Sequence, residues 1–269
     1  MAVARLAWSS VLDKARAVVE GYAEPVTLRQ VFYRLVAASV IPNTVSSYKR
    51  LSALTAGARR AGTFPDLADH GRRIARPLSF TDVTDARAWL RQVYRRDRTA
   101  GQPAAIYLGV EKDALVAQLA AWYDEFGLPV VALRGYGSQT IADLVRRDAQ
   151  RAGRPANLLY AGDFDSSGED IERDFVVRTG CWMHTERVAL TADQIAQFDL
   201  PPQPGKATDS RAAAFTAAHG RLVQVEVDAL APDDLHRLFN LALARWWDRG
   251  AYEAVLESEQ RDLDQLDER

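Results

Sequence analysis

Two short apolar segments that each run into carboxylates constrain this chain more than any other feature. Residues 104–110 lead directly into Glu111, and residues 157–162 lead into Asp163 and Asp165. Both segments are rich in branched and aromatic residues and are followed by a helical pattern, which is typical of buried parallel strands. The carboxyl ends of adjacent parallel strands meet at one edge of an open sheet, where α/β proteins bind ligands. The pattern therefore predicts an α/β fold in which three carboxylates converge.

Carboxylates that converge in this way repel one another unless a cation lies between them. Hard oxygen ligands with room for coordinated water suit Mg²⁺. We therefore predict a magnesium site formed by Glu111, Asp163 and Asp165. The four histidines are scattered and Cys181 is the single cysteine, so the sequence has neither zinc-ligand spacing nor the two cysteines that an internal disulfide needs.

Strand and helix patterns alternate along the middle of the chain. Strands are expected at residues 104–110, 129–133, 157–162 and 185–189, and helices at residues 84–98, 112–126, 138–152 and 167–179. This alternation predicts a parallel sheet with right-handed crossovers. A Pro-rich loop at residues 200–205, a strand near residues 222–227 and helices from about residue 232 are expected to follow.

The first 83 residues are predicted to form a separate helical module. Helices are expected at residues 3–20, 28–39 and 45–61, and Thr27 with Gln30 forms a capping box before the second helix. A helix, a short turn and a basic helix follow one another as in helix-turn-helix proteins, and residues 62–73 are expected to form a wing or a linker. The candidate DNA-binding residues of the third helix are Tyr48, Lys49, Arg50, Arg59 and Arg60.

Charge is divided unevenly along the chain. Residues 1–100 hold 17 Lys and Arg against 8 Asp and Glu, whereas the remainder holds 17 against 28. A basic module beside a carboxylate site fits an enzyme that binds a polyanion and performs metal chemistry, although a solvated basic face with an unrelated acidic tail would give the same counts. The absence of a long apolar stretch in the sequence and the single cysteine favour a cytoplasmic protein that does not enter a membrane.

Four segments of this chain together resemble the A subunit of type IIB DNA topoisomerases (topoisomerase VI), its meiotic double-strand-break relatives and the shorter stand-alone proteins called Topo mini-A. The segments are Leu28-Arg29-Gln30-Val31-Phe32-Tyr33-Arg34, Val110-Glu111-Lys112-Asp113-Ala114, Arg134-Gly135-Tyr136-Gly137 and Asp163-Phe164-Asp165-Ser166-Ser167-Gly168. The resemblance covers nearly the whole chain from about Thr27. It implies a winged-helix module at residues 1–83 and a Toprim α/β domain with C-terminal helices at residues 84–269.

The resemblance also implies an activity and its residues. Tyr33 would attack the backbone of double-stranded DNA and form a 5′-phosphotyrosyl link, while Glu111, Asp163 and Asp165 hold magnesium. The protein would be a homodimer in which the tyrosine of one protomer meets the metal of the other. Because only about 26 residues precede the capping box, an ATPase subunit of the topoisomerase VI kind is not expected to dock on this chain.

Helix geometry gives an independent reason to consider Tyr33. The apolar positions of its helix share one face: Leu28, Val31, Phe32, Leu35 and Val36. Tyr33 lies roughly 120° from the centre of that face, and Arg29 precedes it by one turn. A free phenol has a pKa of about 10, so attack near neutral pH needs a neighbouring cation or base, and Arg29 is the candidate. Lys112, after Glu111, is a candidate contact to phosphate.

Two other functions remain compatible with the sequence. In a hydrolytic Toprim nuclease, water would attack the phosphate and Tyr33 would only pack or contact DNA. In a DNA-binding subunit without catalysis, the metal site would serve structure or the docking of a partner. Tyr33 itself is also compatible with a surface or interface role without chemistry.

Overall fold

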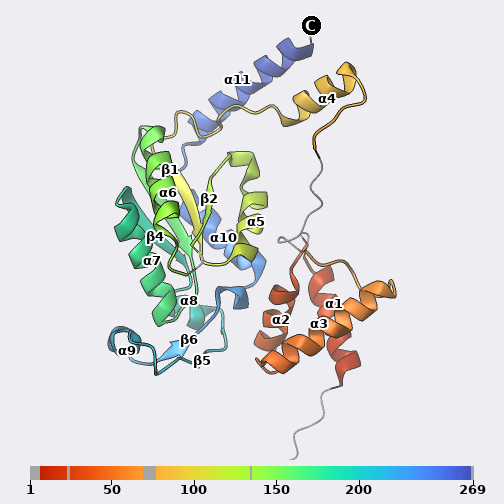
Figure 1. Cartoon of the computed structure of the whole chain (residues 1–269), viewed down its shortest axis with the longest axis vertical. Coiled ribbons are helices and arrows are strands. Elements are labelled where there is room, and N and C mark those ends of the chain that lie inside the picture. Colours follow the sequence, from red (N-terminus) through yellow and green to blue (C-terminus); the bar gives the residue numbers. More distant parts are fainter. Residues whose placement is uncertain (1–6, 23–24, 69–76, 134, 268–269) are drawn as a thin grey trace, which may run out of the picture. The chain divides into compact units, whose positions relative to one another are not determined.

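The computed structural model describes residues 7–22, 25–68, 77–133 and 135–267 (Figure 1). It forms two compact units. The first comprises Met1–Gly71, Ala161–Asp170 and Ala189–Arg237, and the second comprises Arg72–Tyr160, Ile171–Val188 and Leu238–Arg269. Parts of three expected features lie outside the described residues: residues 3–6 of the first helix, residues 69–73 of the wing or linker, and Arg134.

Three helices begin the first unit: α1 (Trp8–Glu20), α2 (Leu28–Ala37) and α3 (Val45–Arg60). The capping box of α2 is confirmed, because the Thr27 hydroxyl accepts from the Gln30 amide while the Gln30 side chain accepts from the Thr27 amide. Thr44 caps α3 in the same way through the Ser47 amide. The apolar faces of the three helices form one core, whose buried members include Val11, Ala15, Val31, Phe32, Leu35 and Leu51.

Besides residues 161–170, the rest of the first unit consists of short elements: α8 (Ala192–Gln197), β5 (Gln203–Pro204), α9 (Ala212–His219), β6 (Val223–Gln224), η2 (Val227–Ala229) and the start of α10 (Pro232–Leu243). β5 and β6 pair in antiparallel fashion. The strand expected near residues 222–227 is therefore much shorter than predicted. It stops because Val225 instead forms an isolated antiparallel bridge with Phe164, after which the backbone turns into η2.

A four-stranded sheet of order β2-β1-β3-β4 is the centre of the second unit, so the predicted α/β class is confirmed. Its strands are β1 (Ala105–Val110), β2 (Val130–Ala132), β3 (Ala156–Ala161) and β4 (Trp182–Ala189). β1 and β2 are parallel, with Leu108 opposite Val130. Every residue of β1 and β3 is buried, which explains why both read as continuous apolar runs in the sequence.

Helices cover both faces of this sheet. They are α5 (Asp113–Trp122), the short η1 (Asp124–Phe126), α6 (Gln139–Ala152) and α7 (Ser166–Thr179). In Figure 1, α6 and α7 lie on one side of the sheet and α5 lies on the other. This arrangement follows from the strand order, because the chain moves from β1 to one neighbour, β2, and then crosses to β3 on the other side of β1.

Two further helices of the second unit lie away from the sheet, α4 (Val83–Val93) and α11 (Arg249–Asp267) (Figure 1). The helix expected to reach residue 98 ends instead at Val93, and Tyr94 is extended. The reason is a long-range contact: the Tyr94 hydroxyl donates to Asp262 Oδ2 at 2.5 Å, and the Arg96 amide donates to Glu259 at 2.9 Å. Bonds to α11 thus replace the bonds that would continue the helix.

Candidate functional site

Tyr33 is held on α2 by aromatic and cationic neighbours. It is half-buried, outside the fully buried face of α2. Its ring meets Phe32 edge-on, with centroids 5.2 Å apart and planes at 74°. The guanidinium of Arg29 lies over the ring, 5.3 Å from its centroid. Tyr33 also lines a hollow of about 210 Å³ together with Asn43, Thr44 and Tyr48. Its ring is therefore fixed while one side borders open space.

Arg29 is bound by two carboxylates that follow β6. Its Nε donates to Asp228 Oδ2 at 2.5 Å, and its Nη2 donates to Glu226 Oε2. The Asp228 side chain is only 1% exposed, whereas those of Arg29 and Glu226 are 41% and 34% exposed. Burial alone lowers the pKa of Arg29, but the charges of Asp228 and Glu226 outweigh burial and raise that pKa above its ordinary value. The guanidinium beside Tyr33 is thus a permanent cation with a fixed orientation.

Residues 225–228 connect this arginine to the first aspartate of the Asp-x-Asp pair. Asp163 Oδ1 accepts from the Val227 amide at 2.9 Å. Phe164 and Val225 exchange two backbone hydrogen bonds, at 2.9 and 3.0 Å. Because Val227 lies between Glu226 and Asp228, one short segment contacts Asp163 through its backbone and Arg29 through its side chains. The first unit therefore brings Tyr33, Arg29 and Asp163 into one network.

Asp165 has a structural contact of its own. Its Oδ1 accepts from the amides of Ser167 at 2.9 Å and Gly168 at 2.7 Å, so it caps the first turn of α7. Asp163 is buried and Asp165 is half-buried. Amide donors therefore orient both carboxylates of the pair. Oriented carboxylate oxygens are a donor set that fits Mg²⁺.

Glu111 and Lys112 belong to the second unit. Glu111 follows the last residue of β1 and is half-buried, and Lys112 precedes the first residue of α5. Asp163 and Asp165 lie in the first unit, whereas Glu111 lies in the second. Among the described residues, no group of three or more His, Cys, Asp and Glu side chains is arranged to hold a metal ion. The magnesium site thus stays a prediction.

The candidate DNA-binding residues of α3 differ in their surroundings. Lys49, Arg59 and Arg60 are exposed, and Arg50 is exposed with its guanidinium over the ring of Trp8, 5.0 Å from the centroid. Tyr48 is half-buried and meets Phe32 edge-on at 5.2 Å. The four basic residues are thus accessible to a polyanion, whereas Tyr48 also packs against the core.

Glu226 and Asp228 are the site residues that the sequence reasoning missed. The sequence of this segment predicts only a strand, and its alternation of acidic and apolar residues indicates no particular partner. In a strand, residues two apart point the same way, so the alternation predicts that Glu226 and Asp228 share one face; in the structure Val227–Ala229 instead form the 3₁₀ helix η2, and both side chains bind Arg29 from this turn. This alternation was the available signal, but nothing in it identifies Arg29 as the partner.

No protein-family model matches this chain, and a comparison with curated proteins found no match either. Within the described residues, no helix is both long and apolar enough to span a bilayer. What the site can do must therefore follow from its residues. A fixed phenol beside a permanent cation, joined to an aspartate with an oriented carboxylate, is suited to nucleophilic attack on a phosphate group.

Proposed function

We propose that this protein is a magnesium-dependent DNA-cleaving transesterase that resembles the A subunit of type IIB topoisomerases and forms a 5′-phosphotyrosyl link through Tyr33. The observation that carries the proposal is the network around residues 225–228. Arg29 binds Glu226 and Asp228 within this segment, and Asp163 accepts from the amide between them. The nucleophile and a metal ligand suggested by the resemblance are thus joined by specific contacts, although they lie 130 residues apart in the sequence.

In the proposed reaction, the Tyr33 hydroxyl oxygen attacks the phosphorus of a DNA phosphodiester. A bond from that oxygen to phosphorus forms and the bond from phosphorus to the 3′-oxygen breaks; the phenol proton passes to solvent, and the leaving 3′-oxygen takes up a proton from solvent. The Arg29 guanidinium, 5.3 Å from the ring centroid, would stabilise the negative charge that develops on the attacking oxygen and on phosphate. Asp228 and Glu226 act as positioning residues, because they hold the guanidinium over the ring. The reverse step releases Tyr33 and rejoins the strand.

The proposed metal ligands are Glu111, Asp163 and Asp165. Two observations support them: β1 and β3, which Glu111 and Asp163 follow, are neighbours in the sheet, and both aspartates accept amide hydrogen bonds that orient their carboxylates. When bound, Mg²⁺ would offset charge on the phosphate and on the leaving oxygen. Lys112, next to Glu111, is proposed to contact phosphate.

We propose that the helical module at residues 1–83 is a winged helix that binds DNA. Residues 84–269 are proposed to form a Toprim domain that binds the metal. The exposed Lys49, Arg50, Arg59 and Arg60 of α3 support a contact with the DNA backbone. Binding through such residues weakens as the salt concentration rises, because neutralised phosphates release counterions. We further propose a homodimer that acts on double-stranded DNA in the cytoplasm.

The proposal is tested by incubating the protein with supercoiled DNA and Mg²⁺ and resolving the products on a denaturing gel. Wild type is expected to leave protein on the 5′ ends, and Tyr33→Phe is expected to leave none. Tyr22→Phe is the matched control, since it removes a hydroxyl from another partly buried tyrosine that packs against the same core. It should form the adduct as wild type does.

Two outcomes would replace the proposal with one of the other functions. Cutting by Tyr33→Phe at the wild-type rate, together with its loss in Asp163→Ala, would identify a hydrolytic nuclease. Binding of DNA without Mg²⁺ and without cutting by wild type would identify a DNA-binding subunit. The Asp163→Ala protein should be checked for folding by circular dichroism, because Asp163 also bonds to the Val227 amide.

A further inference from the structure

A hollow of about 580 Å³ lies in the second unit, where α6 and α7 end and β3 and β4 begin. We call it the α6 hollow, because the C-terminal half of α6 lines it together with residues 153–156 and 180–183. Gly153 and Gly180 follow the two helices with positive φ, which lets the chain turn into each strand. The Ala105 amide donates to the Pro155 carbonyl at 2.8 Å, so the hollow lies at the amino ends of the strands, away from Glu111.

Two arginines line the α6 hollow, and none of its described lining residues is acidic. Among the described residues, Arg154 has no carboxylate partner: its Nη2 donates to the Thr99 hydroxyl at 2.7 Å, and its buried Nε–H has no hydrogen-bond partner. Arg146 pairs with Asp143 on its own helix, but both side chains are more than a third exposed, so this pair is weak. Burial raises the pKa of the Cys181 thiol in the hollow, and the charge of Arg146 opposes that rise.

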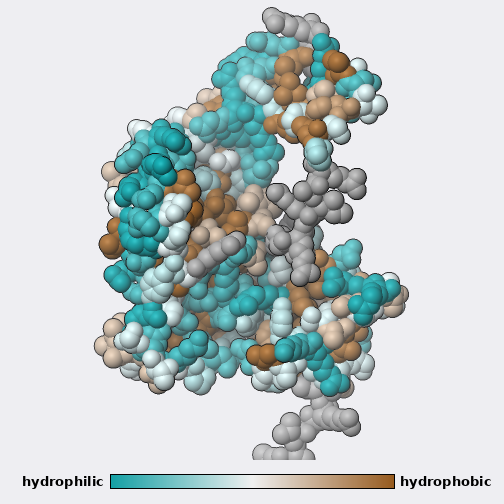
Figure 2. Space-filling view, viewed as in Figure 1, coloured by the Kyte–Doolittle hydropathy of each residue, from teal (hydrophilic) through white to brown (hydrophobic). Residues whose placement is uncertain are grey.

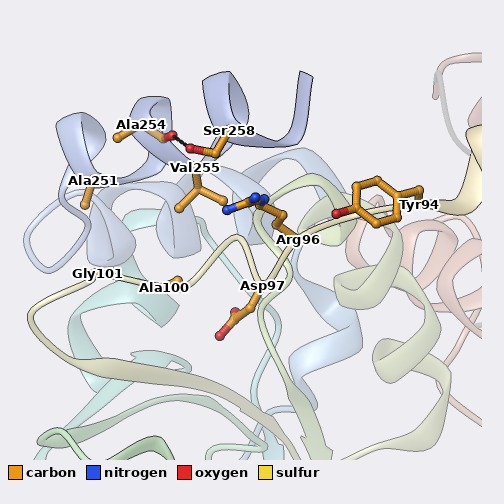
Figure 3. A pocket seen from close by; sticks show the side chains of 9 residues that line it. All are labelled: Tyr94, Arg96, Asp97, Ala100, Gly101, Ala251, Ala254, Val255 and Ser258. Carbon is orange, nitrogen blue, oxygen red and sulfur yellow. Dashed lines mark hydrogen bonds between the residues drawn. The ribbon is translucent and has the colours of Figure 1, made fainter. Parts of the chain in front are cut away.

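A second hollow in the same unit, also of about 580 Å³, provides a contrast (Figure 3). It lies between residues 94–101 and α11, and both Arg96 and Asp97 line it. The Arg96 Nε donates to Asp262 Oδ2 at 2.5 Å, so its guanidinium is already neutralised by a carboxylate. The α6 hollow therefore differs from a hollow of equal size in its surplus of positive charge.

The surroundings of the α6 hollow do not cancel this charge. The carboxyl ends of α6 and α7 carry partial negative charge, but Arg151 and Arg178 in their last turns offset it. Residues 146–154 contain four arginines and one aspartate, Asp148, which accepts from the Tyr107 hydroxyl at 2.7 Å. Figure 2 shows a mainly hydrophilic surface over α6, in agreement with this composition. An anion is the ligand that such a site favours.

Apolar side chains form much of the remaining lining. Trp182 is half-buried and meets Tyr107 edge-on, with ring centroids 5.3 Å apart, and its indole N–H has no hydrogen-bond partner among the described residues. Met183, beside it, is 73% exposed. Hollows of roughly 300 to 1,000 Å³ with apolar walls and a few polar groups are typical of small-molecule sites. The α6 hollow thus has room for a flat ring next to an anionic group.

We propose that the α6 hollow binds a nucleotide through its 5′-phosphate. A phosphate monoester carries up to two negative charges near neutral pH, so it matches two guanidinium groups better than a carboxylate, which carries one. Arg146 and Arg154 would bind the phosphate, and Trp182 would contact the base. The nucleotide is either free or the 5′-phosphorylated end of a DNA strand, since both have this chemistry. The inference goes beyond the proposed function, because none of these residues takes part in the proposed cleavage.

The first test is calorimetric titration of the full-length protein with adenosine 5′-monophosphate in the absence of Mg²⁺. Wild type should bind with a dissociation constant below roughly 1 mM. Adenosine should bind at least about 10-fold more weakly, because it lacks the phosphate. Arg146→Gln and Arg154→Gln should each raise the dissociation constant by at least about 10-fold, because each removes a charged donor. Arg96→Gln, the same change in the second hollow, is the control and should bind as wild type does.

Cys181 provides a test of location, because it is the single cysteine and lines the α6 hollow. Its alkylation by iodoacetamide is followed at alkaline pH, since burial raises the pKa of the thiol. Mass spectrometry of the tryptic peptide at residues 179–187 measures the rate. Saturating adenosine 5′-monophosphate should slow this alkylation in wild type, whereas adenosine at the same concentration should not. An unchanged rate under saturation would place the ligand elsewhere and contradict the inference.

A single-stranded hexanucleotide distinguishes the two sources of the nucleotide. It is titrated with a 5′-phosphate and, as the control, with a 5′-hydroxyl group. If the phosphorylated strand binds more tightly than adenosine 5′-monophosphate and protects Cys181 only when phosphorylated, the ligand is a DNA end. If the free nucleotide binds more tightly and protects better than the strand, the ligand is the free nucleotide. Either result supports the site.

Three results would overturn the inference. They are a wild type that does not bind adenosine 5′-monophosphate up to roughly 10 mM, binding of adenosine as tight as that of the monophosphate, and arginine variants that bind as wild type does. Arg146→Gln changes an exposed side chain and is expected to fold, which circular dichroism checks. Tyr33→Phe should bind the nucleotide normally. A Tyr33 adduct without nucleotide binding would refute this inference alone, whereas nucleotide binding without the adduct would refute the proposed cleavage alone.

Discussion

Helices α2 and α4 are built from the same local signals but lie in opposite surroundings. α2 has 10 residues and α4 has 11, each is capped by a side chain at its N-terminus, and each carries an apolar stripe. α2 buries Gln30, Val31, Phe32, Leu35 and Val36, whereas α4 buries none of its residues. Local sequence therefore determines that a helix forms, and a partner surface determines what the helix can do.

For α2, the partner surface is the core of the first unit and the segment at residues 225–228. These contacts fix Arg29 over Tyr33, the arrangement that the proposed nucleophile and its cation need. For α4, the large apolar side chains Val83, Leu90 and Val93 stay exposed. The same comparison predicts that substitutions in the two regions have different effects on stability, and four experiments test it.

The largest difference is expected for leucine truncation. Leu35→Ala should lower the free energy of unfolding by about 2 to 5 kcal/mol, because Leu35 is 1% exposed and its loss leaves a cavity. Leu90→Ala should change it by less than about 0.5 kcal/mol when measured at protein concentrations too low for association. Urea unfolding followed by circular dichroism measures both. Equal effects would mean that α4 is packed within its own chain.

A smaller difference is expected between the two carboxylates that bind Arg29. Asp228→Ala should destabilise the protein by about 1 to 3 kcal/mol, since it removes a buried hydrogen-bonding partner. Glu226→Ala should cost about 1 kcal/mol or less, because that pair is partly exposed and screened by water. Thermal unfolding of both variants provides the comparison. A larger loss for Glu226→Ala would contradict the assigned roles.

Removal of the two helix caps should differ in how much of the protein it destabilises, as well as in the change in the free energy of unfolding. Thr27→Ala should lower global stability by about 1 kcal/mol, because α2 is part of a core. Asp82→Ala should leave global stability unchanged and speed amide hydrogen exchange only within α4. Exchange measured by mass spectrometry, with unfolding curves for both proteins, separates these cases. Faster exchange across the second unit in Asp82→Ala would contradict the independence of α4.

The smallest effect concerns the contact that ends α4. The hydrogen bond from Arg96, and then that from Tyr94, lower the pKa of Asp262 to about 2. A lowered pKa means that the contact stabilises the fold fully above the unfolded value of about 3.9 and that this contribution is lost as the pH falls through about 2. Carboxyl NMR of Asp262 should show this midpoint. Arg96→Gln should move it upward, and an unchanged midpoint would contradict the pairing.

The sequence was most informative where structure depends on neighbouring residues. The apolar runs before Glu111 and Asp163 correspond to β1 and β3, because strands buried on both faces need apolar side chains at every position. The capping box at Thr27 marked the start of α2, since its hydrogen bonds span only three residues. Both features could be read directly from a short segment.

Contacts between distant segments could not be read in this way. Arg29 and Asp228 are 199 residues apart, so the network around Tyr33 could not be predicted from the motif that contains the tyrosine. The early end of α4 depends on Asp262, which lies 168 residues beyond Tyr94. The short helices α8 and α9 were also missed, because six and eight residues are too few to establish a helical period.

Mass spectrometry of the protein–DNA adduct tests the central claim most directly. After reaction with DNA and Mg²⁺, the adduct is digested with nuclease and then with trypsin, which cuts after Arg29 and Arg34 and releases residues 30–34. We predict that this peptide carries a nucleotide remnant, linked through its 5′-phosphate to Tyr33. Free 5′-phosphate ends with an unmodified peptide, or a remnant on any other residue, would contradict the account.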